Sequence, residues 1–289
     1  MNDISTEELL RHNKMGLIPG PDETEEEYGR RIEYCQNVRK ELGEVLPFEE
    51  KDEAREEILQ DVLPDTKKWM DIIPDWIPIY FSNYKLAPWH GGCAWIFQLN
   101  DESPTSAFFQ LRKRFKDRSK YLGYSRNEIL VHELSHVGRM MFEEPQFEEV
   151  LAYRSSKTGF RRWFGPIVQS SIESMLFVIV LIMILVTDIA VISIGDDFGY
   201  HLVLWLKLIP VGMIGVAILR LWKKHLIFGK CLENLRLVHR EKADVIAYRL
   251  TDEEIRGFAR MTVDEIQEFA ETEQEKSLRW RLIWAAYFS

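Results

Sequence analysis

The sequence predicts an α+β protein that carries a two-helix membrane hairpin. Short runs of aromatic and β-branched residues, separated by Pro, Gly, Asn and Ser, indicate strands between residues 76 and 115. On both sides of these runs, apolar residues recur at three- and four-residue steps, which is the period of a helix with one buried face. Charged residues become sparse between Ser171 and Trp222, whereas the rest of the chain is rich in acidic residues.

Residues 1–75 are expected to form the helical N-terminal part of a soluble domain. Thr24 and Glu27 have the spacing of a capping box, which predicts the start of a helix. A second, charged helix is expected from Glu50 to Leu63. The predicted buried stripe of the first helix consists of Tyr28, Ile32, Cys35, Val38 and Leu42.

Residues 76–165 are expected to begin with a small antiparallel sheet. The predicted strands are Trp76–Asn83, Cys93–Leu99 and Ala107–Phe115. The loop between the last two is polar and contains proline, so we expect these two strands to form a hairpin.

Two helices are expected after the sheet. The first extends from Ser125 to about Phe142, and the chain then breaks at Glu144 and Pro145. The second begins at Gln146 and ends near residue 156.

Residues 170–225 contain two apolar stretches, Ile172–Ile194 and Tyr200–Trp222. As a helix, each can cross about 30 Å of hydrocarbon, so we expect a transmembrane hairpin in a lipid bilayer rather than a buried core hairpin. Asp188 and Lys207 lie at similar distances from the connecting loop, and we expect them to pair. Basic residues flank the hairpin and its loop is acidic, which places the N- and C-terminal segments in the cytoplasm and the protein in the inner membrane. The flanking basic residues are Lys157, Arg161, Arg162, Arg220, Lys223, Lys224 and Lys230.

Residues 226–289 are expected to form a helical cytoplasmic segment. Two further capping boxes, Thr251 with Glu254 and Thr262 with Glu265, predict helix starts. Residues 277–288 mix Arg with aromatic side chains, a composition that suits either docking on the domain or lying at the lipid interface.

Charge and cysteine content argue against several function classes. The net charge is −9 and no basic patch is apparent, so nucleic acid is not an expected partner, because phosphate binding needs a basic face. The three cysteines, Cys35, Cys93 and Cys231, have the spacing of neither a metal-ligand pair nor a disulfide framework, and we expect free thiols. The first residues lack the apolar stretch of an export signal, which agrees with a cytoplasmic N-terminal segment.

The candidate metal site lies in the first helix after the sheet, where residues 132–136 read His-Glu-Leu-Ser-His. Positions i and i+4 share one helix face, so His132 and His136 can bind one metal ion, and Zn²⁺ is the cation expected for this pattern. Glu133 lies beside them and can act as the catalytic base toward water. The helix is largely apolar, which weighs against two histidines that merely occur on a solvated face.

A catalytic zinc site needs a third protein ligand and one open position. The extended motif with a third histidine is absent, so a glutamate is expected. Glu149 is favoured because Ala152, three residues later, allows the second helix to approach the first closely. Glu148, Glu241 and His239 remain alternatives.

Three further residues are weaker candidates for the site. Tyr153 and Arg154 follow the predicted ligand helix and can stabilise an oxyanion, although a tyrosine in this position more often packs. Asp244 can orient a ligand histidine through its second nitrogen, or can simply cap a helix.

The two motifs, His-Glu-x-x-His and then Glu-x-x-Ala, resemble the gluzincin branch of the zincin metallopeptidases. The resemblance covers about Ser125–Arg154 and implies a zincin-like core over residues 76–165. It also implies that an edge strand, here Cys93–Leu99, aligns the substrate over the active-site helix. Only twelve residues separate His136 from Glu149, so the intervening turn must be tight, and Pro145 permits such a turn.

Over a longer range the chain resembles the integral-membrane zinc proteases of the heat-shock and CAAX-processing type. These proteases place the His-Glu-x-x-His helix before a membrane hairpin and a Glu-x-x-Ala-Asp motif after it. Residues 239–248 read HREKADVIAY, in which Glu241 stands two residues before Ala243 instead of three. Arg240 occupies the position that the ligand should take.

The sequence therefore predicts a membrane-anchored zinc metalloendopeptidase that hydrolyses bonds in peptide or protein substrates. The alternative is a non-catalytic, membrane-anchored scaffold in which the metal is structural or absent. An intramembrane protease is disfavoured, because the two histidines lie outside any apolar run.

Overall fold

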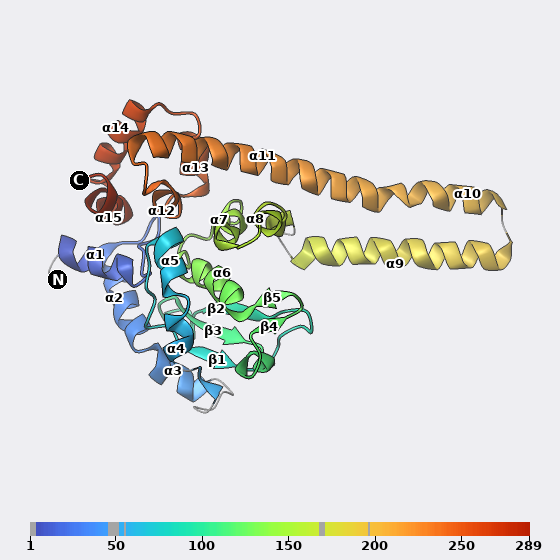
Figure 1. Cartoon of the computed structure of the whole chain (residues 1–289), viewed down its shortest axis with the longest axis horizontal. Coiled ribbons are helices and arrows are strands. Elements are labelled where there is room, and N and C mark those ends of the chain that lie inside the picture. The colour runs from blue at the N-terminus through green and yellow to red at the C-terminus, as the bar shows by residue number, and fades with distance from the viewer. Residues whose placement is uncertain (1–3, 46–51, 55, 168–170, 196) are drawn as a thin grey trace.

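The computed structural model describes residues 4–45, 52–54, 56–167, 171–195 and 197–289. The fold is mixed α+β and mostly helical, with a small sheet and two long apolar helices that project from the folded domain (Figure 1). The α+β class expected from the sequence is confirmed.

The N-terminal helices begin where the capping signals predict. In α1 (Thr6–Lys14) and α2 (Glu25–Gln36), an N-cap hydroxyl accepts the N3 backbone N–H and the N3 glutamate returns a bond to the N-cap. After α2 the chain continues as α3 (Val38–Val45), and all five residues of the predicted stripe are buried.

The charged helix expected over Glu50–Leu63 is shorter than predicted where the structure describes it. Residues 50, 51 and 55 of that range lie outside the described residues, and α4 covers only Glu56–Gln60. A separate helix, α5 (Leu63–Met70), follows, with a proline in its first turn where no intrahelical N–H is needed.

The sheet is mixed rather than wholly antiparallel. Strand β2 (Gly92–Phe97) pairs antiparallel with β3 (Ser106–Leu111), which confirms the predicted hairpin. Strand β1 (Ile79–Phe81) lies on the other side of β3 and runs parallel to it, because the chain crosses over before it enters β2. β2 is thus an edge strand, and β1 is much shorter than its aromatic run suggests. A small second sheet pairs β4 (Lys120–Tyr121) with β5 (Tyr124–Ser125).

The two helices after the sheet are α6 (Arg126–Gly138) and α7 (Glu148–Ala152), both shorter than expected. α6 ends four residues before Phe142, in a series of i→i−3 turns, and Glu143 has a left-handed backbone (φ 46°). α7 passes directly into a 3-10 turn, η3 (Tyr153–Ser155), and the short helix α8 (Gly159–Phe164) and turn η4 (Gly165–Ile167) lead towards the long helices.

Two helices are long and apolar enough to cross a membrane. The first is α9 (Ser171–Ile194), and the second apolar stretch comprises α10 (Asp197–Leu206) and α11 (Leu208–Val238). The break at Lys207 was not predicted; Pro210 explains it, because it has no N–H to donate to the carbonyl of Leu206. Asp188 and Lys207 form the expected pair at 2.9 Å.

α11 does not end at Trp222 but continues to Val238, so its C-terminal half belongs to the folded domain. The C-terminal helices α12 (Ala243–Ala247) and α13 (Asp252–Phe258) pack against it. α14 (Val263–Glu273) also begins at its predicted capping box. The last helix, α15 (Leu278–Tyr287), packs on α1 and α14 with Trp280 and Ile283 buried, which favours docking over the lipid interface.

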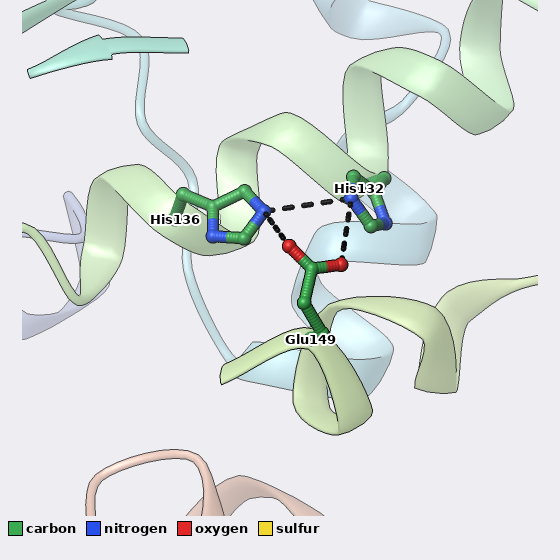
Figure 2. Close-up of side chains that lie close together, drawn as sticks. All are labelled: His132, His136 and Glu149. Atoms are coloured by element: carbon green, nitrogen blue, oxygen red, sulfur yellow. Dashed lines mark hydrogen bonds and ion pairs between the residues drawn. The ribbon is translucent and has the colours of Figure 1, made fainter. Parts of the chain in front are cut away.

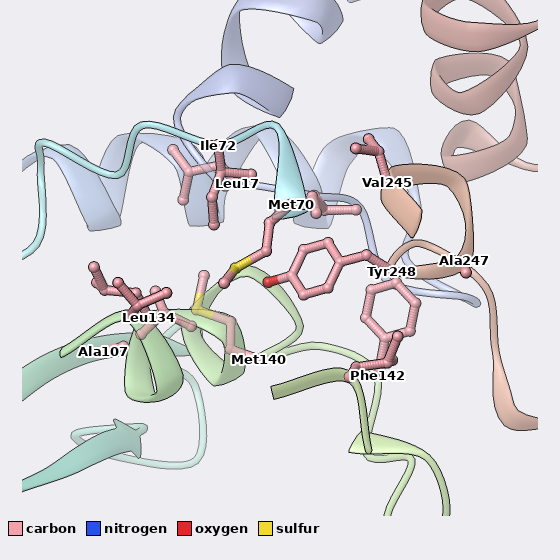
Figure 3. Packing of buried hydrophobic residues seen from close by; sticks show 14 of the residues in the cluster. Leu17, Met70, Ile72, Ala107, Leu134, Met140, Phe142, Val245, Ala247 and Tyr248 are labelled. Atoms are coloured by element: carbon pink, nitrogen blue, oxygen red, sulfur yellow. The ribbon is translucent and has the colours of Figure 1, made fainter. Parts of the chain in front are cut away.

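A single hydrophobic core joins segments that lie far apart in the sequence. Figure 3 shows Leu17 from the N-terminal segment, Leu134 from α6 and Tyr248 from the C-terminal segment packed in one cluster. The hairpin is therefore an insertion, because the chain leaves this domain at η4 and returns to it along α11.

Candidate metal centre

The helix α6 presents its apolar residues to the core and its histidines to the opposite side. Ser125 caps the helix by accepting the N–H of Glu128, and Leu130, Val131, Leu134 and Val137 are buried. His132 and His136 are half-buried on the face that looks towards α7. The helical spacing of the two histidines alone therefore places both imidazoles on the same face of α6.

Glu149 on α7 completes a compact group with these two histidines (Figure 2). The Nε2 atoms of His132 and His136 are 3.4 Å apart. Glu149 Oε2 lies 3.7 Å from Nε2 of His132, and Glu149 Oε1 lies 3.7 Å from Nε2 of His136. Zinc with bonds of about 2.0–2.1 Å in tetrahedral geometry separates its ligand atoms by about 3.3 Å. The three side chains therefore fit a zinc-sized cation after a contraction of a few tenths of an ångström.

Glu148, the residue before Glu149, has a different position. Its Oε1 lies 2.7 Å from Nδ1 of His136, on the side of the ring away from the group of three. A carboxylate there accepts the Nδ1–H and leaves the Nε2 lone pair directed at the metal position. Glu148 is thus placed to orient a ligand histidine, the role for which the sequence offered Asp244.

The two imidazoles differ in their affinity for protons. Burial and the neighbouring His136 lower the pKa of His132 to about 3. Burial also acts on His136, but the hydrogen bond to Glu148 and the charges of Glu133 and Glu149 outweigh it and raise the pKa of His136 to about 9. Burial raises the pKa of Glu149 as well. A cation that binds both Nε2 atoms must therefore displace a proton from His136.

Glu133 is anchored to the edge strand of the sheet. Its Oε2 accepts the backbone N–H of Ala94 at 2.8 Å. This contact requires β2 to lie close to α6, and two glycines allow it. A Cβ on Gly91 would lie 2.4 Å from Ile129 Cδ1, and one on Gly92 would lie 3.1 Å from Ile129 Cγ2. Glycines therefore set the distance between the strand and the helix that carries Glu133.

A cavity of about 220 Å³ opens beside the group of three. His132, Glu133 and Tyr153 contribute to its wall, together with the loop that contains Trp89. The Tyr153 ring stands edge-on to His132, with centroids 4.5 Å apart, and burial raises the pKa of its hydroxyl. A Cβ on Gly165 would lie 2.3 Å from that ring, so this glycine makes room for Tyr153.

The remaining sequence candidates lie elsewhere. Glu241 and His239 are exposed after the end of α11, and neither belongs to the group of three. Asp244 pairs with Arg154 at 2.5 Å and with Arg236 at 3.8 Å, so it ties the end of α7 to the C-terminal segment. Arg154 is engaged in that pair rather than directed at the metal position.

Contacts from the C-terminal segment fix α6, and sequence reasoning did not find them. Tyr248 donates its hydroxyl proton to the carbonyl of Ser135 at 2.6 Å, which is possible because Gly138 has no side chain. Arg139 donates in return to the carbonyls of Tyr248 and Leu250. The signal in the sequence that could have indicated this close approach was Gly138, which stands inside the predicted helix Ser125–Phe142.

Comparison with known family models, with curated proteins and with solved structures finds no match for this chain.

Proposed function

We propose that this chain is a membrane-anchored zinc metallopeptidase with a zincin-like, gluzincin-type core. The observation that carries the proposal is the group formed by His132, His136 and Glu149, whose ligand atoms all lie within 4.8 Å of one another. Two imidazoles and one carboxylate are a donor set that suits catalytic zinc. Glu148 on the second nitrogen of His136 adds the outer-sphere carboxylate that such sites use.

Peptide-bond hydrolysis is the reaction that these side chains support best. When bound, zinc supplies Lewis acidity, which polarises a substrate carbonyl and makes water more acidic. Glu133 is held through Oε2 by Ala94, so its other oxygen can take a proton from the attacking water and return it to the leaving nitrogen. Tyr153, at the wall of the adjacent cavity, is the side chain placed to stabilise the oxyanion.

The edge strand supplies a means of binding an extended peptide. β2 pairs only with β3 within the described sheet, and the Ala94 N–H on its other side points to Glu133. A substrate chain can add to this edge as a further strand, which places its backbone beside the catalytic base. This mode favours unfolded or extended segments of peptide and protein substrates.

The two apolar helices α9 and α10–α11 support anchoring in the inner membrane. In the described residues of these spans, almost no side chains are covered by the rest of the protein. Basic residues lie on the domain side and acidic residues in the loop, which favours a cytoplasmic domain.

Zinc stoichiometry, measured together with cleavage of an unfolded test protein, tests the proposal. The wild type should bind one zinc ion and cleave, Glu133→Gln should bind zinc without cleaving, and Glu149→Gln should lose zinc. Glu241→Gln is the matched control and should retain both properties. Undiminished cleavage by Glu133→Gln would remove Glu133 from the mechanism, and no zinc in the wild type would leave only the membrane-anchored scaffold.

A further inference from the structure

Three large apolar side chains stand exposed around the candidate centre. Trp89 is 70% exposed, Leu122 is 64% exposed and Phe160 is 72% exposed. They come from the loop before β2, the β4–β5 turn and α8. Trp89 also lines the cavity beside His132 and Glu133. Removing apolar surface from water is favourable, so several large exposed apolar side chains on one surface indicate that this surface binds another molecule or a membrane.

The segments that carry these three side chains are joined into one surface. The hydroxyl of Tyr121 donates to the carbonyl of Pro88, which fixes the Trp89 loop against β4. Arg161 of α8 donates to the carbonyl of Gly123 at 2.7 Å and stacks over Tyr124 at 4.1 Å. We call the surface formed by Trp89, Leu122 and Phe160 the apolar rim.

A run of cations adjoins the apolar rim. Residues 112–120 read RKRFKDRSK, and they form the short 3-10 helix η2 (Lys113–Lys116) and lead into β4. Arg112 and Arg114 both stack on Tyr121, which places the run beside the β4–β5 turn. This run corrects the expectation that no basic patch exists, because a net charge of −9 for the whole chain concealed it. The exposed cations are Lys113, Arg114, Lys116, Arg118 and Lys120.

The apolar rim lies on the side of the domain that faces the long helices. Figure 1 shows β4, β5 and α8 at the end of the domain from which α9 departs. Only η4 and a few residues separate α8 from the start of α9. If the hairpin spans a bilayer, the rim and the basic run are therefore directed at the surface of that bilayer.

We propose that the apolar rim and the basic run bind the anionic surface of the membrane in which the hairpin is anchored. Trp89, Leu122 and Phe160 enter the interfacial layer, and the five cations contact lipid phosphates. The cavity beside His132 then opens at the bilayer surface. This inference rests on the proposed membrane anchor, and it narrows the substrate class to chain segments that emerge from the bilayer close to the enzyme.

Nucleic acid is the competing partner for a basic run. The apolar rim argues against it, because an aliphatic side chain such as Leu122 offers neither stacking nor a hydrogen bond to a base. Continuity with two helices that are long and apolar enough to cross a membrane favours the membrane instead.

Photo-crosslinking of the full chain to phospholipid tests the proposal. A photoreactive phenylalanine analogue is placed at position 89, 122 or 160, and the protein is reconstituted in nanodiscs of phosphatidylcholine with phosphatidylglycerol. Lipid capture is expected at all three positions. Position 237 is the matched control, because Leu237 is 70% exposed but lies at the domain end of α11, well beyond the end of the apolar stretch at Trp222. No capture is expected there.

A charge variant tests the basic run separately. Replacement of four cations by Gln should lower capture at position 122 by roughly tenfold in anionic discs. A second set of four exposed cations, replaced in the same way, should leave capture unchanged. The test set is Lys113, Arg114, Arg118 and Lys120, and the control set is Arg30, Lys40, Arg240 and Arg260.

The outcomes separate this inference from the proposals on which it depends. The analogue at position 182, in the middle of α9, reports the anchor, and no lipid capture there would overturn anchoring and inference together. Capture at 182 without capture at 122 and 160 would overturn the inference alone, as would crosslinking of the rim to an added oligonucleotide in place of lipid. Cleavage is a separate readout, because Glu133→Gln should abolish it without altering lipid capture.

Discussion

Asp252 caps the helix of Phe147 from 105 residues further along the chain, and its Oδ1 accepts the Phe147 N–H at 3.0 Å. Its Oδ2 accepts the N–H of Gln146 at 2.8 Å. Because α7 has no side-chain cap of its own, this carboxylate satisfies the start of the helix that carries Glu148 and Glu149. Asp252 also begins α13, which packs on α11. One carboxylate thus joins α7 to α13 and, through the packing of α13, to α11.

Replacement of Asp252 by Ala should weaken both stability and zinc binding. The change leaves the buried N–H of Phe147 and the partly buried N–H of Gln146 without an acceptor, which should cost about 2 kcal/mol in the free energy of unfolding. The freed helix start should also let Glu149 drift from the histidines. Urea unfolding and a zinc titration measure the two effects. Asp264→Ala, at an exposed first-turn position of α14, is the control and should change neither. Equal losses in both variants would contradict the capping argument.

Replacement of Glu148 by Gln should lower zinc affinity without unfolding the protein. The amide is a weaker acceptor than the carboxylate, so Nδ1–H of His136 is held less firmly and Nε2 becomes a weaker donor to the metal. We expect an affinity loss of about 10–100-fold, measured by competition with a chelator of known strength. Glu143→Gln removes a nearby exposed charge and should have little effect. Similar losses in the two variants would indicate a general charge effect instead.

The sequence was informative where the argument was local. The spacing of His132 and His136 predicted that both lie on one face of a helix. The four-residue pattern of the capping box located three predicted helix starts. Asp188 and Lys207 pair, as predicted, because they lie at similar distances from the turn between the two helices. Glu149 lies close to the two histidines for a similar reason, because the short connection between α6 and α7 restricts where α7 can lie relative to α6.

The remaining features of the fold and the site depend on contacts between residues far apart in the sequence, which no local pattern predicts. Ala94 and Glu133 are 39 residues apart, and Tyr248 and Ser135 are 113 apart. Such contacts follow from how separate segments share one core, so the sequence gives no spacing to read. The parallel pairing of β1 has the same origin, because strand direction is set by the crossover and not by the residues of the strand.

Replacement of Gly92 by Ala should separate the edge strand β2 from α6, the helix that carries Glu133. The added Cβ would lie 2.8 Å from Phe109 Cζ of β3 and 3.1 Å from Ile129 Cγ2 of α6. The Phe109 ring must shift, and β2 must move away from α6 to relieve the contact with Ile129. We expect a loss of about 1–3 kcal/mol in stability and a lower rate of cleavage, because the Ala94 contact to Glu133 weakens. Gly29→Ala in α2 has nothing within 4 Å of its Cβ and should stabilise by about 0.5–1 kcal/mol. A tolerated Gly92→Ala would show that the strand can shift freely.

Acid should destabilise the C-terminal helices through Glu254. Burial opposes ionisation, but the charge of Arg279 and hydrogen bonds from Arg279, Thr251 and Trp280 hold the pKa of Glu254 below its ordinary value of 4.5. A carboxyl with a lowered folded pKa stabilises fully above its unfolded pKa, and the contribution disappears as the pH falls through the folded value. Glu254→Gln should therefore be less stable by about 3 kcal/mol at neutral pH. In thermal melts from pH 7 downwards, the difference in stability between Glu254→Gln and the wild type should become smaller only below about pH 4.5. A difference that stays constant with pH would contradict a lowered pKa for Glu254.

The pair formed by Asp188 and Lys207 should show strong coupling in a double-mutant cycle. Both side chains belong to the apolar hairpin, with Lys207 Nζ 2.9 Å from Asp188 Oδ2. Removing one partner leaves the other as a lone charge in hydrocarbon, which costs about 2.5–3.5 kcal/mol. Removing both leaves no charge to desolvate. Asp188→Leu and Lys207→Leu should therefore each destabilise the hairpin in nanodiscs, whereas the double variant should be close to wild type. Glu173 and Arg220, paired at 2.6 Å at the domain end of the two apolar stretches, provide the comparison cycle. Coupling should be weaker there, because water reaches the ends of a membrane-spanning helix more readily than its interior. Additive effects for Asp188 and Lys207 would mean that the pair is hydrated, and hence that this part of the hairpin does not lie in the hydrocarbon.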